Sequence, residues 1–537
     1  MTRPDAAAVR RTAKQVFGHD RPLPGQEEAI AAAVADRDVL MVSPTGSGKS
    51  LVYQLTGVLR DGVTVVVSPL LALQHDQAES LAEGGRATRS ARISSAETDN
   101  QIEESLAAAA EGALEFLFLA PEQLAKPDVL ARIAALEPSL VAVDEAHCVS
   151  AWGHDFRPDY LRLGDLIDTL GRPPVVALTA TASEPVREDI VARLRMDAPA
   201  VVVTGFARDN LDLGVVPCHD GADQRDKLLA AVAERDGPGI VYTRTRRSAE
   251  DYAAALADSG VQATHYHAGV ASRLRRATHD RFLGGDLRLI VATSAFGMGI
   301  DKPDVRFVLH AQVPESPDTY YQEVGRAGRD GEQAEGLLFY RSEDLALGRF
   351  FSSGVPDTAD VMRAAKALDA DPDATRKELQ GASGLGPRRL GRLLNLVEEV
   401  RTLHGDLTGR RLAEAVVEQA GSHRNLERSR VEMVRAYAET GRCRMEFLVG
   451  YFGEDLDRRC GHCDNCRSGS AEDHASEEDP VYDVQQHVVH PEFGTGTVMD
   501  VEDDRVTVLF DQVGYRTLSL AVVEAQGLLA QDGDAED

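Results

Sequence analysis

The chain has 537 residues, 43% of them hydrophobic, with 6 cysteines and a formal net charge of −29 at pH 7. This length predicts three or four domains with ample core and excludes a small module held together by disulfides. No apolar run reaches the roughly 18 residues of a membrane-spanning helix, and the first residues lack the apolar stretch of a signal peptide. We therefore expect a cytoplasmic protein that has no membrane partner.

The acidic balance argues against nucleic-acid binding spread over the whole surface, because such binding rests largely on neutralising phosphates. Much of the charge lies at the end of the chain, where Ser468–Asp537 holds 17 acidic and 2 basic residues. A nucleic-acid site would therefore lie in a local groove, or would use base stacking, which does not depend on charge.

An apolar strand and a glycine-rich loop open the first α/β segment. The predicted strand Val39–Val42 is followed by S-P-T-G-S-G-K-S, Ser43–Ser50, and then by a helical pattern. In this context the glycines let backbone N–H groups close around phosphates, Lys49 reaches the β and γ oxygens, and the Ser50 hydroxyl completes a Mg²⁺ shell. The sequence therefore predicts a site for ATP and Mg²⁺. Its loop residues are Thr45, Gly46, Ser47, Gly48, Lys49 and Ser50.

A second motif combines two carboxylates with an aromatic loop. The apolar run Leu140–Val143 predicts a buried parallel strand whose carboxyl end carries Asp144 and Glu145. Asp144 would hold Mg²⁺, and Glu145 would orient the attacking water. Flat rings and cations follow closely, a mixture suited to stacking on unpaired bases and to reporting that contact to the carboxylates. The loop contains Trp152, His154, Phe156, Arg157 and Tyr160.

Strands alternate with helical patterns twice, which predicts an ATP-binding lobe at 1–205 and a second parallel-sheet lobe at 206–350, with ATP in the cleft between them. In the second lobe, YYQEVGRAGRDG places Arg326 and Arg329 three residues apart beside glycines. Both can therefore point into the cleft and neutralise charge on the γ-phosphate. The expected strands are Val39–Val42, Val63–Ser68, Glu115–Ala120, Leu140–Val143, Val175–Thr179, Gly239–Thr243, Leu287–Thr293 and Val305–His310.

Together these motifs resemble the RecQ family of superfamily 2 DNA helicases. The resemblance runs from about Phe17 to Arg467 and includes LPGQEEAI, SPLLALQHDQ, APEQL, LTATAS, YHAG and ATSAFGMGIDKPDVRFVLH, with WGHDFRP as its most characteristic loop. It implies an α/β fold of two tandem RecA-like lobes followed by a zinc-binding region. It also implies an ATP-dependent helicase that moves 3′ to 5′ on single-stranded DNA and unwinds duplex or branched DNA in recombination and repair.

The resemblance implies roles for further residues. Gln26 would read the adenine, and Asp301 would lie at the interface between the lobes. Thr179 and Thr181 would couple hydrolysis to DNA contact.

The chain departs from the family at His19 and Leu23, where tyrosine and arginine are common. Two alternative functions stay open. One is a non-catalytic adaptor that keeps the motor fold as a scaffold for nucleic acid and RNA polymerase, and the other is an RNA helicase. The intact catalytic residues argue against the adaptor, and the aromatic loop together with a cysteine cluster favours DNA over RNA.

From 351 to 467 the pattern becomes helical and rich in arginine. Ala374–Val400 contains two amphipathic stretches divided by a glycine-rich turn. That pattern is typical of a helix-turn-helix with Arg388, Arg389 and Arg392 facing phosphate. A helical spacer explains it equally well.

Four cysteines close this region. CGHCDNC places Cys460, Cys463 and Cys466 at two-residue gaps, and Cys443 would be the fourth ligand, from a preceding helix. Four thiolates at this spacing match one tetrahedral Zn²⁺, whereas disulfides between such close neighbours would be strained. We expect a structural zinc site.

The last segments are an acidic linker at 468–483 and short alternating strands at 484–530, which predict a small β-barrel. The barrel resembles the SH3/Tudor-like domain of UvrD/PcrA-type helicases, and this resemblance implies RNA polymerase as a partner. We expect the barrel to range freely on its linker. Its candidate contacts are Glu492, Phe493 and Tyr515, although Phe493 fits the barrel core equally well.

Overall fold

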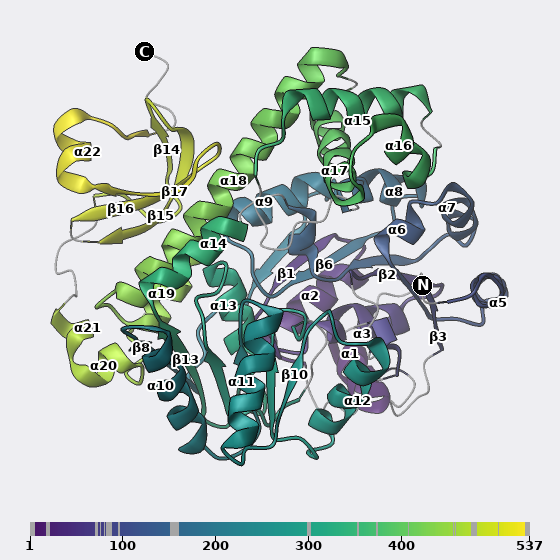
Figure 1. The fold of residues 1–537 in the computed structure, drawn as a ribbon. Coiled ribbons are helices and arrows are strands. Elements are labelled where there is room, and N and C mark those ends of the chain that lie inside the picture. The colour runs from purple at the N-terminus through teal and green to yellow at the C-terminus, as the bar shows by residue number, and fades with distance from the viewer. Residues whose placement is uncertain are drawn as a thin grey trace.

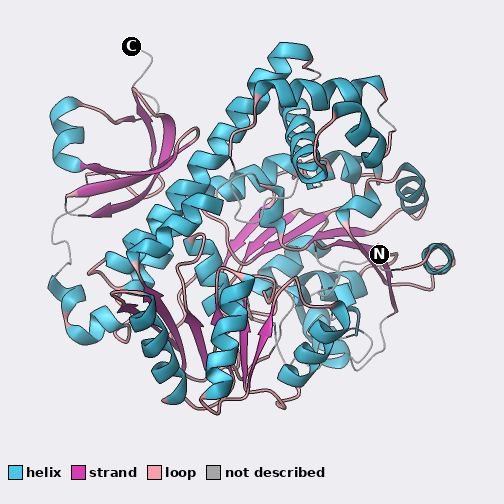
Figure 2. Ribbon diagram, viewed as in Figure 1, coloured by secondary structure: helices cyan, strands magenta, loops and turns pink. Residues whose placement is uncertain are grey.

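The computed structural model describes residues 6–17, 22–69, 74–75, 77–79, 81, 89–94, 97–150, 160–297, 302–351, 354–371, 374–405, 407–454, 456, 458–473, 481–502 and 504–531. Figure 1 shows a first lobe in purple and blue, a second lobe in teal, a helical region in green and a C-terminal sheet in yellow. The strands form three separate sheets, and helices cover the two large ones (Figure 2).

The first lobe is built on a seven-stranded parallel sheet in the order β3-β4-β2-β5-β6-β1-β7. Its central strands are buried along their whole length because helices lie on both faces, as the unbroken apolar runs predict. The strands are β1 (Val39–Val42), β2 (Thr64–Val67), β3 (Ser90–Ile93), β4 (Phe116–Leu119), β5 (Leu140–Val143), β6 (Val175–Thr179) and β7 (Ala200–Val203). The helices are α1 (Ala6–Phe17), α2 (Pro24–Val34), α3 (Ser50–Leu59), α5 (Asp99–Ala110), α6 (Pro121–Leu124), α7 (Pro127–Ala134), α8 (Leu163–Thr169) and α9 (Glu184–Arg193).

The second lobe repeats this design with a six-stranded parallel sheet in the order β10-β11-β9-β12-β13-β8. Its strands are β8 (Leu211–Pro217), β9 (Gly239–Tyr242), β10 (Ala263–Tyr266), β11 (Leu289–Ala292), β12 (Phe307–His310) and β13 (Ala334–Tyr340). Its helices are α10 (Gly221–Ala233), α11 (Arg246–Asp258), α12 (Ser272–Leu283), α13 (Pro317–Val324) and α14 (Leu345–Phe351). Two parallel-sheet lobes are therefore present, as the sequence predicts.

A helical region follows the second lobe. It contains α15 (Thr358–Ala370), α16 (Arg376–Ser383), α17 (Pro387–His404) and α18 (Gly409–Glu439). The helix α16 ends at Gly384, whose φ of 66° reverses the chain into α17. Apolar residues of α15, α16, α17 and the start of α18 form a hydrophobic cluster of their own. The two helices and the short turn between them therefore belong to a small packed helical domain.

The long helix α18 leads to the cysteine-bearing region, with α19 (Arg444–Tyr451), α20 (Asp464–Ser468) and α21 (Ser470–Asp473). The expected linker 468–483 therefore begins as a helix. Ala471 is buried and the Ser470 hydroxyl donates to the carbonyl of Gly441 at 3.1 Å, so this first part packs on the preceding region. Residues 474–480 lie outside the described part of the chain.

The C-terminal domain is a five-stranded antiparallel sheet in the order β17-β16-β15-β14-β18, with one helix. Its elements are β14 (His487–His490), β15 (Gly494–Glu502), β16 (Arg505–Phe510), β17 (Gly514–Ser519), α22 (Leu520–Gln526) and β18 (Ala530–Gln531). Alternate residues of the strands face a small apolar core, as the alternating sequence predicts.

This sheet is docked on α18 and α19 and does not range freely. The backbone N–H of Tyr515 donates to Ser429 Oγ at 3.0 Å, and Arg442 Nη1 donates to both carboxylate oxygens of Asp500 at 2.9 and 3.0 Å. Tyr515 is only 6% exposed. The expectations of a freely ranging barrel and of Tyr515 as an exposed contact are therefore wrong, because an alternating pattern does not reveal that another domain covers one edge of the sheet.

The other two candidate contacts differ from each other. Phe493 is half-buried and packs against Phe510 in the core of the sheet, with ring centroids 5.3 Å apart, so the core alternative holds for it. Glu492 is exposed.

Across the described residues, no helix is both long enough and apolar enough to cross a membrane.

Candidate functional site

The glycine-rich loop lies between β1 and α3, at the carboxyl edge of the first sheet. Gly46 and Gly48 adopt positive φ angles of 83° and 71°, which glycine reaches without strain. The Lys49 ammonium donates to the carbonyls of Ser43 and Pro44 at 2.8 and 3.1 Å. Burial lowers the pKa of Lys49 to about 8, against the opposing effect of two nearby carboxylates. The loop thus combines two exposed glycines with a half-buried cation, as a phosphate site needs.

Two oxygen atoms suited to a divalent cation contact the same side-chain amide next to this loop. Gln77 Nε2 donates to Asp144 Oδ2 at 2.8 Å and lies 3.5 Å from Ser50 Oγ. One amide nitrogen therefore spans both oxygens, and a carboxylate paired with a hydroxyl is a donor set that Mg²⁺ accepts. Burial raises the pKa of Asp144, while the bond from Gln77 and the charge of Lys49 oppose that rise.

A polar chain runs from Glu145 to the next strand. Glu145 has φ 50° and ψ 48°, a left-handed conformation that side chains rarely adopt outside constrained sites. Its Oε2 lies 3.4 Å from His147 Nδ1, and the same nitrogen lies 3.0 Å from Thr179 Oγ1. The Thr179 hydroxyl donates in turn to the carbonyl of Thr181 at 3.1 Å. Buried groups thus link the end of β5 to the end of β6.

Gln26, on α2, holds the glycine-rich loop from the other side. Its Nε2 donates to the carbonyls of Ser47 and Gly48 at 2.8 and 3.0 Å, and its Oε1 accepts from the backbone N–H of Leu23 at 2.9 Å. Both amide hydrogens are therefore engaged with the loop in this structure. Reading adenine would require Gln26 to exchange one of these bonds, so that role stays a prediction.

A cavity of about 680 Å³ lies between the two lobes and is lined by both. Arg208 joins its walls, because its guanidinium donates to the carbonyl of Thr45 in the first lobe at 3.4 Å and to that of Gly328 in the second at 2.9 Å. Residues lining the first-lobe side include Leu23, Gln26, Ser43, Thr45, Gly46 and Ser47, and those on the second-lobe side include Arg208, Asn210, Gly328 and Arg329. The cleft between the lobes is therefore open next to the glycine-rich loop.

The two predicted arginines follow α13 at this cleft. A methyl group placed on Gly46 would lie 2.7 Å from Arg329 Cγ, so the Arg329 side chain passes directly over the loop. Arg326 is 3% exposed, and its Nε has no hydrogen-bond partner among the described residues. A buried N–H donor without a partner is costly, which suits a group that binds an anion.

Several predicted residues cannot be placed. Trp152, His154, Phe156 and Arg157 of the aromatic loop, and Asp301, lie outside the described residues.

The four predicted zinc ligands meet at one point. The sulfur atoms of Cys443, Cys460, Cys463 and Cys466 all lie within 4.8 Å of one another. Cys460 Sγ is 3.4 Å from Cys443 Sγ and 3.9 Å from Cys466 Sγ, close to the spacing of about 3.8 Å that tetrahedral ligation at ~2.3 Å requires. Cys443 is the N-cap residue of α19, the helix that precedes the other three cysteines in the chain.

Backbone N–H groups point at these sulfurs, as they do around thiolates that bind a metal. The N–H groups of Arg444 and Cys466 both donate to Cys463 Sγ at 3.4 Å, and those of Cys460 and Cys463 donate to the sulfurs of Cys443 and Cys460 at 3.4 and 3.3 Å. The cluster therefore fits a structural zinc ion with four thiolates.

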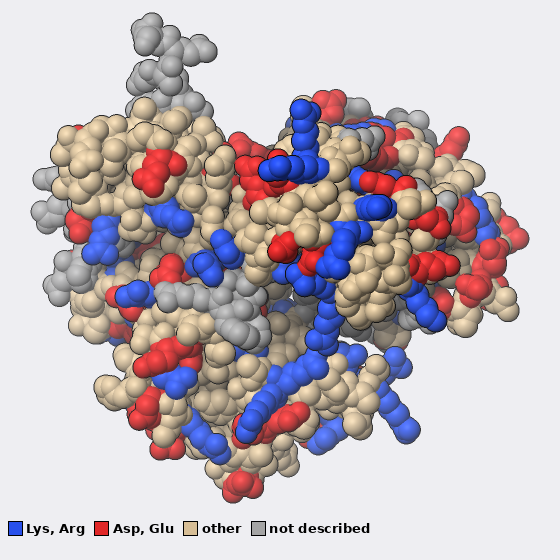
Figure 3. Space-filling view, turned by 45° about the horizontal axis from the view of Figure 1, so that its top comes forward, with Lys and Arg blue, Asp and Glu red and all other residues tan. Residues whose placement is uncertain are grey.

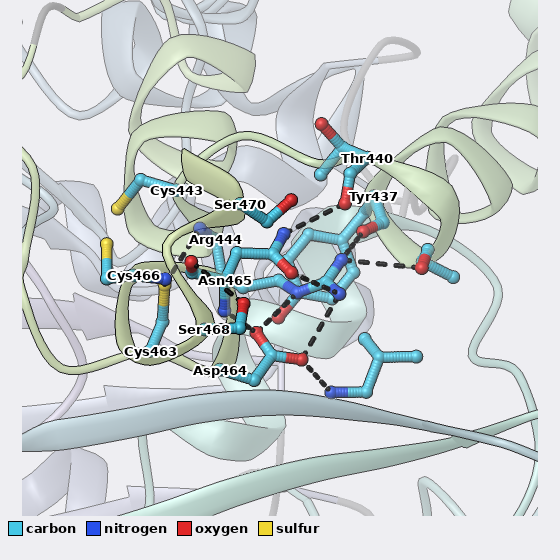
Figure 4. A network of polar contacts seen from close by, with 12 residues as sticks. Tyr437, Thr440, Cys443, Arg444, Cys463, Asp464, Asn465, Cys466, Ser468 and Ser470 are labelled. Atoms are coloured by element: carbon cyan, nitrogen blue, oxygen red, sulfur yellow. Dashed lines mark hydrogen bonds and ion pairs between the residues drawn. The ribbon is translucent and has the colours of Figure 1, made fainter. Parts of the chain in front are cut away.

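An ion pair between a buried arginine and a half-buried aspartate ties the cysteine cluster to the second lobe (Figure 4). Arg444 Nε donates to Asp464 Oδ1 at 2.9 Å, and Asp464 Oδ2 accepts from the backbone N–H of Val215 on β8 at 2.9 Å. His462 Nδ1 lies 2.8 Å from Asp212 Oδ1, also on β8. His462 therefore helps to dock the cluster on the edge strand and is not a ligand.

Comparison with known proteins shows the family of the chain. It matches the DEAD/DEAH box helicase family over residues 23–189, the helicase conserved C-terminal domain over 223–331 and the RecQ zinc-binding family over 404–467. It is 32% identical over 466 residues to the probable ATP-dependent DNA helicase RecS of Bacillus subtilis, a match that covers 85% of this chain and 92% of that protein. The chain belongs to the RecQ family of superfamily 2 helicases.

Another relative is the ATP-dependent DNA helicase RecQ of Bacillus subtilis, 40% identical over 338 residues. That match covers 62% of this RecQ-family chain but only 56% of the relative, so the chain spans little more than half of that protein. Among solved structures, Mycobacterium smegmatis helicase Lhr bound to ssDNA and AMP-PNP has a TM-score of 0.52 and 24% identity over 73% of this chain and 57% of that one. This likeness concerns the two-lobed fold.

Three residues of this RecQ-family site escaped the sequence prediction. Gln77 spans Ser50 and Asp144, His147 joins Glu145 to Thr179, and Arg208 joins the two walls of the cavity. Gln77 ends SPLLALQHDQ, a motif that carries the family resemblance, and His147 stands two residues after the predicted catalytic Glu145, so both positions could have been singled out from the sequence. Arg208 stands in an ordinary stretch after β7, and only the folded chain brings it to the cleft.

Proposed function

We propose that the chain is an ATP-dependent DNA helicase that translocates 3′ to 5′ on single-stranded DNA and unwinds duplex or branched DNA in recombination and repair. The observation that carries this proposal is the position of Arg329, whose side chain lies over Gly46 although the two residues belong to different lobes. A motor of this kind needs a nucleotide gripped by both lobes, since closure and opening of the cleft then follow binding and hydrolysis.

Each residue of the cleft has a proposed role in hydrolysis. Residues 45–50 cradle the phosphates, with Lys49 on the β and γ oxygens. Ser50 and Asp144 would hold Mg²⁺, which supplies charge neutralisation to the phosphates when bound. Glu145 orients the attacking water. Arg326 and Arg329 stabilise negative charge on the γ-phosphate, a contribution worth about 10³ or more in rate for an arginine finger.

The polar chain from Glu145 through His147 to Thr179 supports a coupling role. A shift of the loop after β6 would move His147 and, through it, the carboxylate that orients water. The aromatic loop begins close after this chain, so DNA held there could report to the same groups. We assign Thr179, Thr181 and the aromatic residues Trp152, His154, Phe156 and Arg157 to this coupling.

Basic side chains support a local nucleic-acid path. On one face of the molecule, Lys and Arg side chains form a band along the hollow between the second lobe and the helical region (Figure 3). Arg246 and Arg247 begin α11, and Arg273 and Arg276 lie on the first turns of α12, all exposed at the carboxyl edge of the second sheet. A local band of this kind reconciles DNA binding with a net charge of −29.

The small helical domain is the proposed docking site for duplex DNA. Arg388, Arg389 and Arg392 are exposed near the start of α17, where a helix-turn-helix presents its second helix. Part of their charge is balanced within the protein, because Arg389 pairs with Asp360. Phosphate would compete with that carboxylate for the guanidinium.

RNA polymerase is the proposed partner of the C-terminal sheet, on the strength of the sequence resemblance to Tudor-like domains alone. Glu492 is the exposed member of the candidate contacts. Pull-down of RNA polymerase with the wild-type chain and with Glu492→Ala tests this partner, and equal recovery would dismiss Glu492 as a contact.

Rates of ATP hydrolysis with single-stranded DNA, with RNA and without nucleic acid decide between the candidate functions. A DNA helicase should be stimulated by DNA and much less by RNA. An RNA helicase should show the reverse order, and an adaptor should hydrolyse no ATP. Arg329→Ala should remove hydrolysis while ATP still binds.

A further inference from the structure

The C-terminal sheet contacts the second lobe through a short series of buried side chains. Tyr515 on β17 stacks on Tyr451 of α19, with ring centroids 5.2 Å apart and planes 24° from parallel. The Tyr451 hydroxyl donates to Asp318 Oδ2 at 2.6 Å. Asp318 belongs to the first turn of α13, and α13 runs directly into Gly325 and Arg326. Two contacts therefore separate the sheet from the helix that carries the cleft arginines.

The position of Tyr515 is closely defined. Its backbone N–H donates to Ser429 Oγ at 3.0 Å, and the neighbouring Gly514 lies so close to α18 that an added methyl group would meet Ser429 Oγ at 2.3 Å. A bulkier residue at 514 would force the strand away from the helix. The contact thus depends on a specific approach of strand to helix, and it is not a loose surface encounter.

A buried cation lies at the centre of these contacts. Arg430 of α18 is 8% exposed and interacts electrostatically with Asp318, Tyr451 and Tyr515. Burial works against its charged form, yet these three neighbours raise the pKa of Arg430. A buried guanidinium needs a countercharge, and among these neighbours the carboxylate of Asp318, on α13, supplies it.

The remainder of α13 is held by residues outside the sheet. Tyr320 accepts from Tyr437 of α18 at 3.1 Å, and Tyr321 donates to the carbonyl of Phe206, between the lobes, at 2.7 Å. Phe206 stacks in turn on Phe452, with centroids 4.4 Å apart. The helix before the arginines is therefore fixed along one side by the zinc-bearing region, and its first turn is fixed with help from the sheet.

We propose that the C-terminal sheet sets the rate of ATP hydrolysis by holding α13, and that Tyr515 is a positioning residue for Arg326 and Arg329. This proposal rests on the proposed role of those two arginines. Undocking of the sheet, by a partner or by substitution, would loosen the first turn of α13 and misplace the arginines over the phosphates. Small misplacements of catalytic groups are costly, since a shift of about 1 Å can lower a rate by about 10².

The test uses the full chain with four substitutions made one at a time: Tyr515→Ala, Tyr515→Phe, Tyr451→Phe and Thr517→Ala. Turnover is measured with saturating single-stranded DNA, and ATP affinity by equilibrium binding of a fluorescent ATP analogue. Tyr515→Ala should lower kcat by about tenfold with unchanged ATP affinity, because the arginines act on the reaction more than on binding. Tyr451→Phe, which loses only the bond to Asp318, should lower kcat less.

Two variants serve as controls. Tyr515→Phe keeps the stacked ring and should retain wild-type turnover. Thr517 is an exposed residue two positions after Tyr515 on β17. The Thr517→Ala variant should therefore also have wild-type turnover. Wild-type kcat in Tyr515→Ala or in Tyr451→Phe overturns the proposal, and so does a loss of ATP binding that parallels the loss of turnover.

Arg329→Ala separates this proposal from the proposed function on which it rests. If Arg329→Ala hydrolyses ATP normally, the arginine assignment itself is wrong. If Arg329→Ala is inactive while Tyr515→Ala retains full turnover, only the positioning role of the sheet is wrong.

Discussion

The imidazole of His147 lies 3.0 Å from the hydroxyl of Thr179 and 3.4 Å from the carboxylate of Glu145. His147 thereby connects the end of β5, where Glu145 would orient water, to the end of β6, where Thr179 would respond to DNA. Thr179→Ala should keep ATP binding and basal hydrolysis but lose most of the stimulation by single-stranded DNA, because the imidazole loses its link to β6. Hydrolysis rates with and without DNA measure this, and an unchanged ratio of the two rates would contradict the link.

The chemistry of hydrolysis can be tested at the two ends of the phosphate site. Lys49→Ala should lower turnover by on the order of 10² or more, since one preorganised cation on the transferred phosphate is removed. Glu145→Gln should bind ATP normally yet turn it over about 10² to 10⁴ times more slowly, because water loses its orienting carboxylate. Near-normal turnover in either variant, measured by phosphate release, would falsify the assignment.

The aromatic loop should contribute base stacking to the motor. Trp152→Ala or Phe156→Ala should weaken DNA-stimulated hydrolysis and unwinding while nucleotide binding is spared, since stacking is worth ~1 to 3 kcal/mol per base. Stopped-flow unwinding and nucleotide titration of the same preparations separate the two effects. Normal stimulation in both variants would mean that the loop has only a structural role.

The sequence predicted the parts of the fold that burial dictates. Central strands such as β5 read as unbroken apolar runs because both of their faces are covered. The edge strand β10 was missed, since its residues are all half-buried and their pattern resembles that of a loop. The interior strand β13 was missed as well, although most of its residues are buried. Among the site residues, Arg208 was missed because its function depends on a contact between lobes, and no local spacing records such a contact.

The C-terminal sheet also shows that a local sequence pattern does not record contacts between domains. Its alternating pattern was sufficient to predict strands, but the buried position of Tyr515 depends on α18 and α19, which lie earlier in the chain. A side chain that alternates outward from a small sheet reads as exposed until its neighbouring domain is known. Tertiary packing, and not local propensity, decided that position.

The zinc ion should hold the end of the helical region on the second lobe. Cys463→Ser should give a zinc-poor protein in which residues after α18 are cleaved quickly by protease, because structural zinc supplies about 10 to 16 kcal/mol to small modules. Metal analysis and limited proteolysis measure the two effects. Cys218→Ser, a half-buried thiol elsewhere in the second lobe, is the matched control and should keep full zinc content. Wild-type protein without zinc would refute the site.

Duplex binding by the small helical domain predicts a specific change in salt dependence. Replacing Arg388, Arg389 and Arg392 together by Ala should weaken binding to duplex DNA and lower the slope of log affinity against log salt by about 0.9 for each phosphate that is no longer neutralised. Binding to single-stranded DNA and hydrolysis stimulated by it should change little, because those depend on the two lobes.

A charge-matched control removes three exposed arginines elsewhere, Arg225, Arg435 and Arg505, which lie on α10, α18 and β16. Because it changes the net charge by the same amount, it separates a local contact from a general electrostatic effect. Fluorescence anisotropy with a duplex over a range of salt concentrations gives both slopes. Equal slopes in the two triple variants would show that the helix-turn-helix arrangement of α16 and α17 does not contact DNA, and that the domain has a packing role alone.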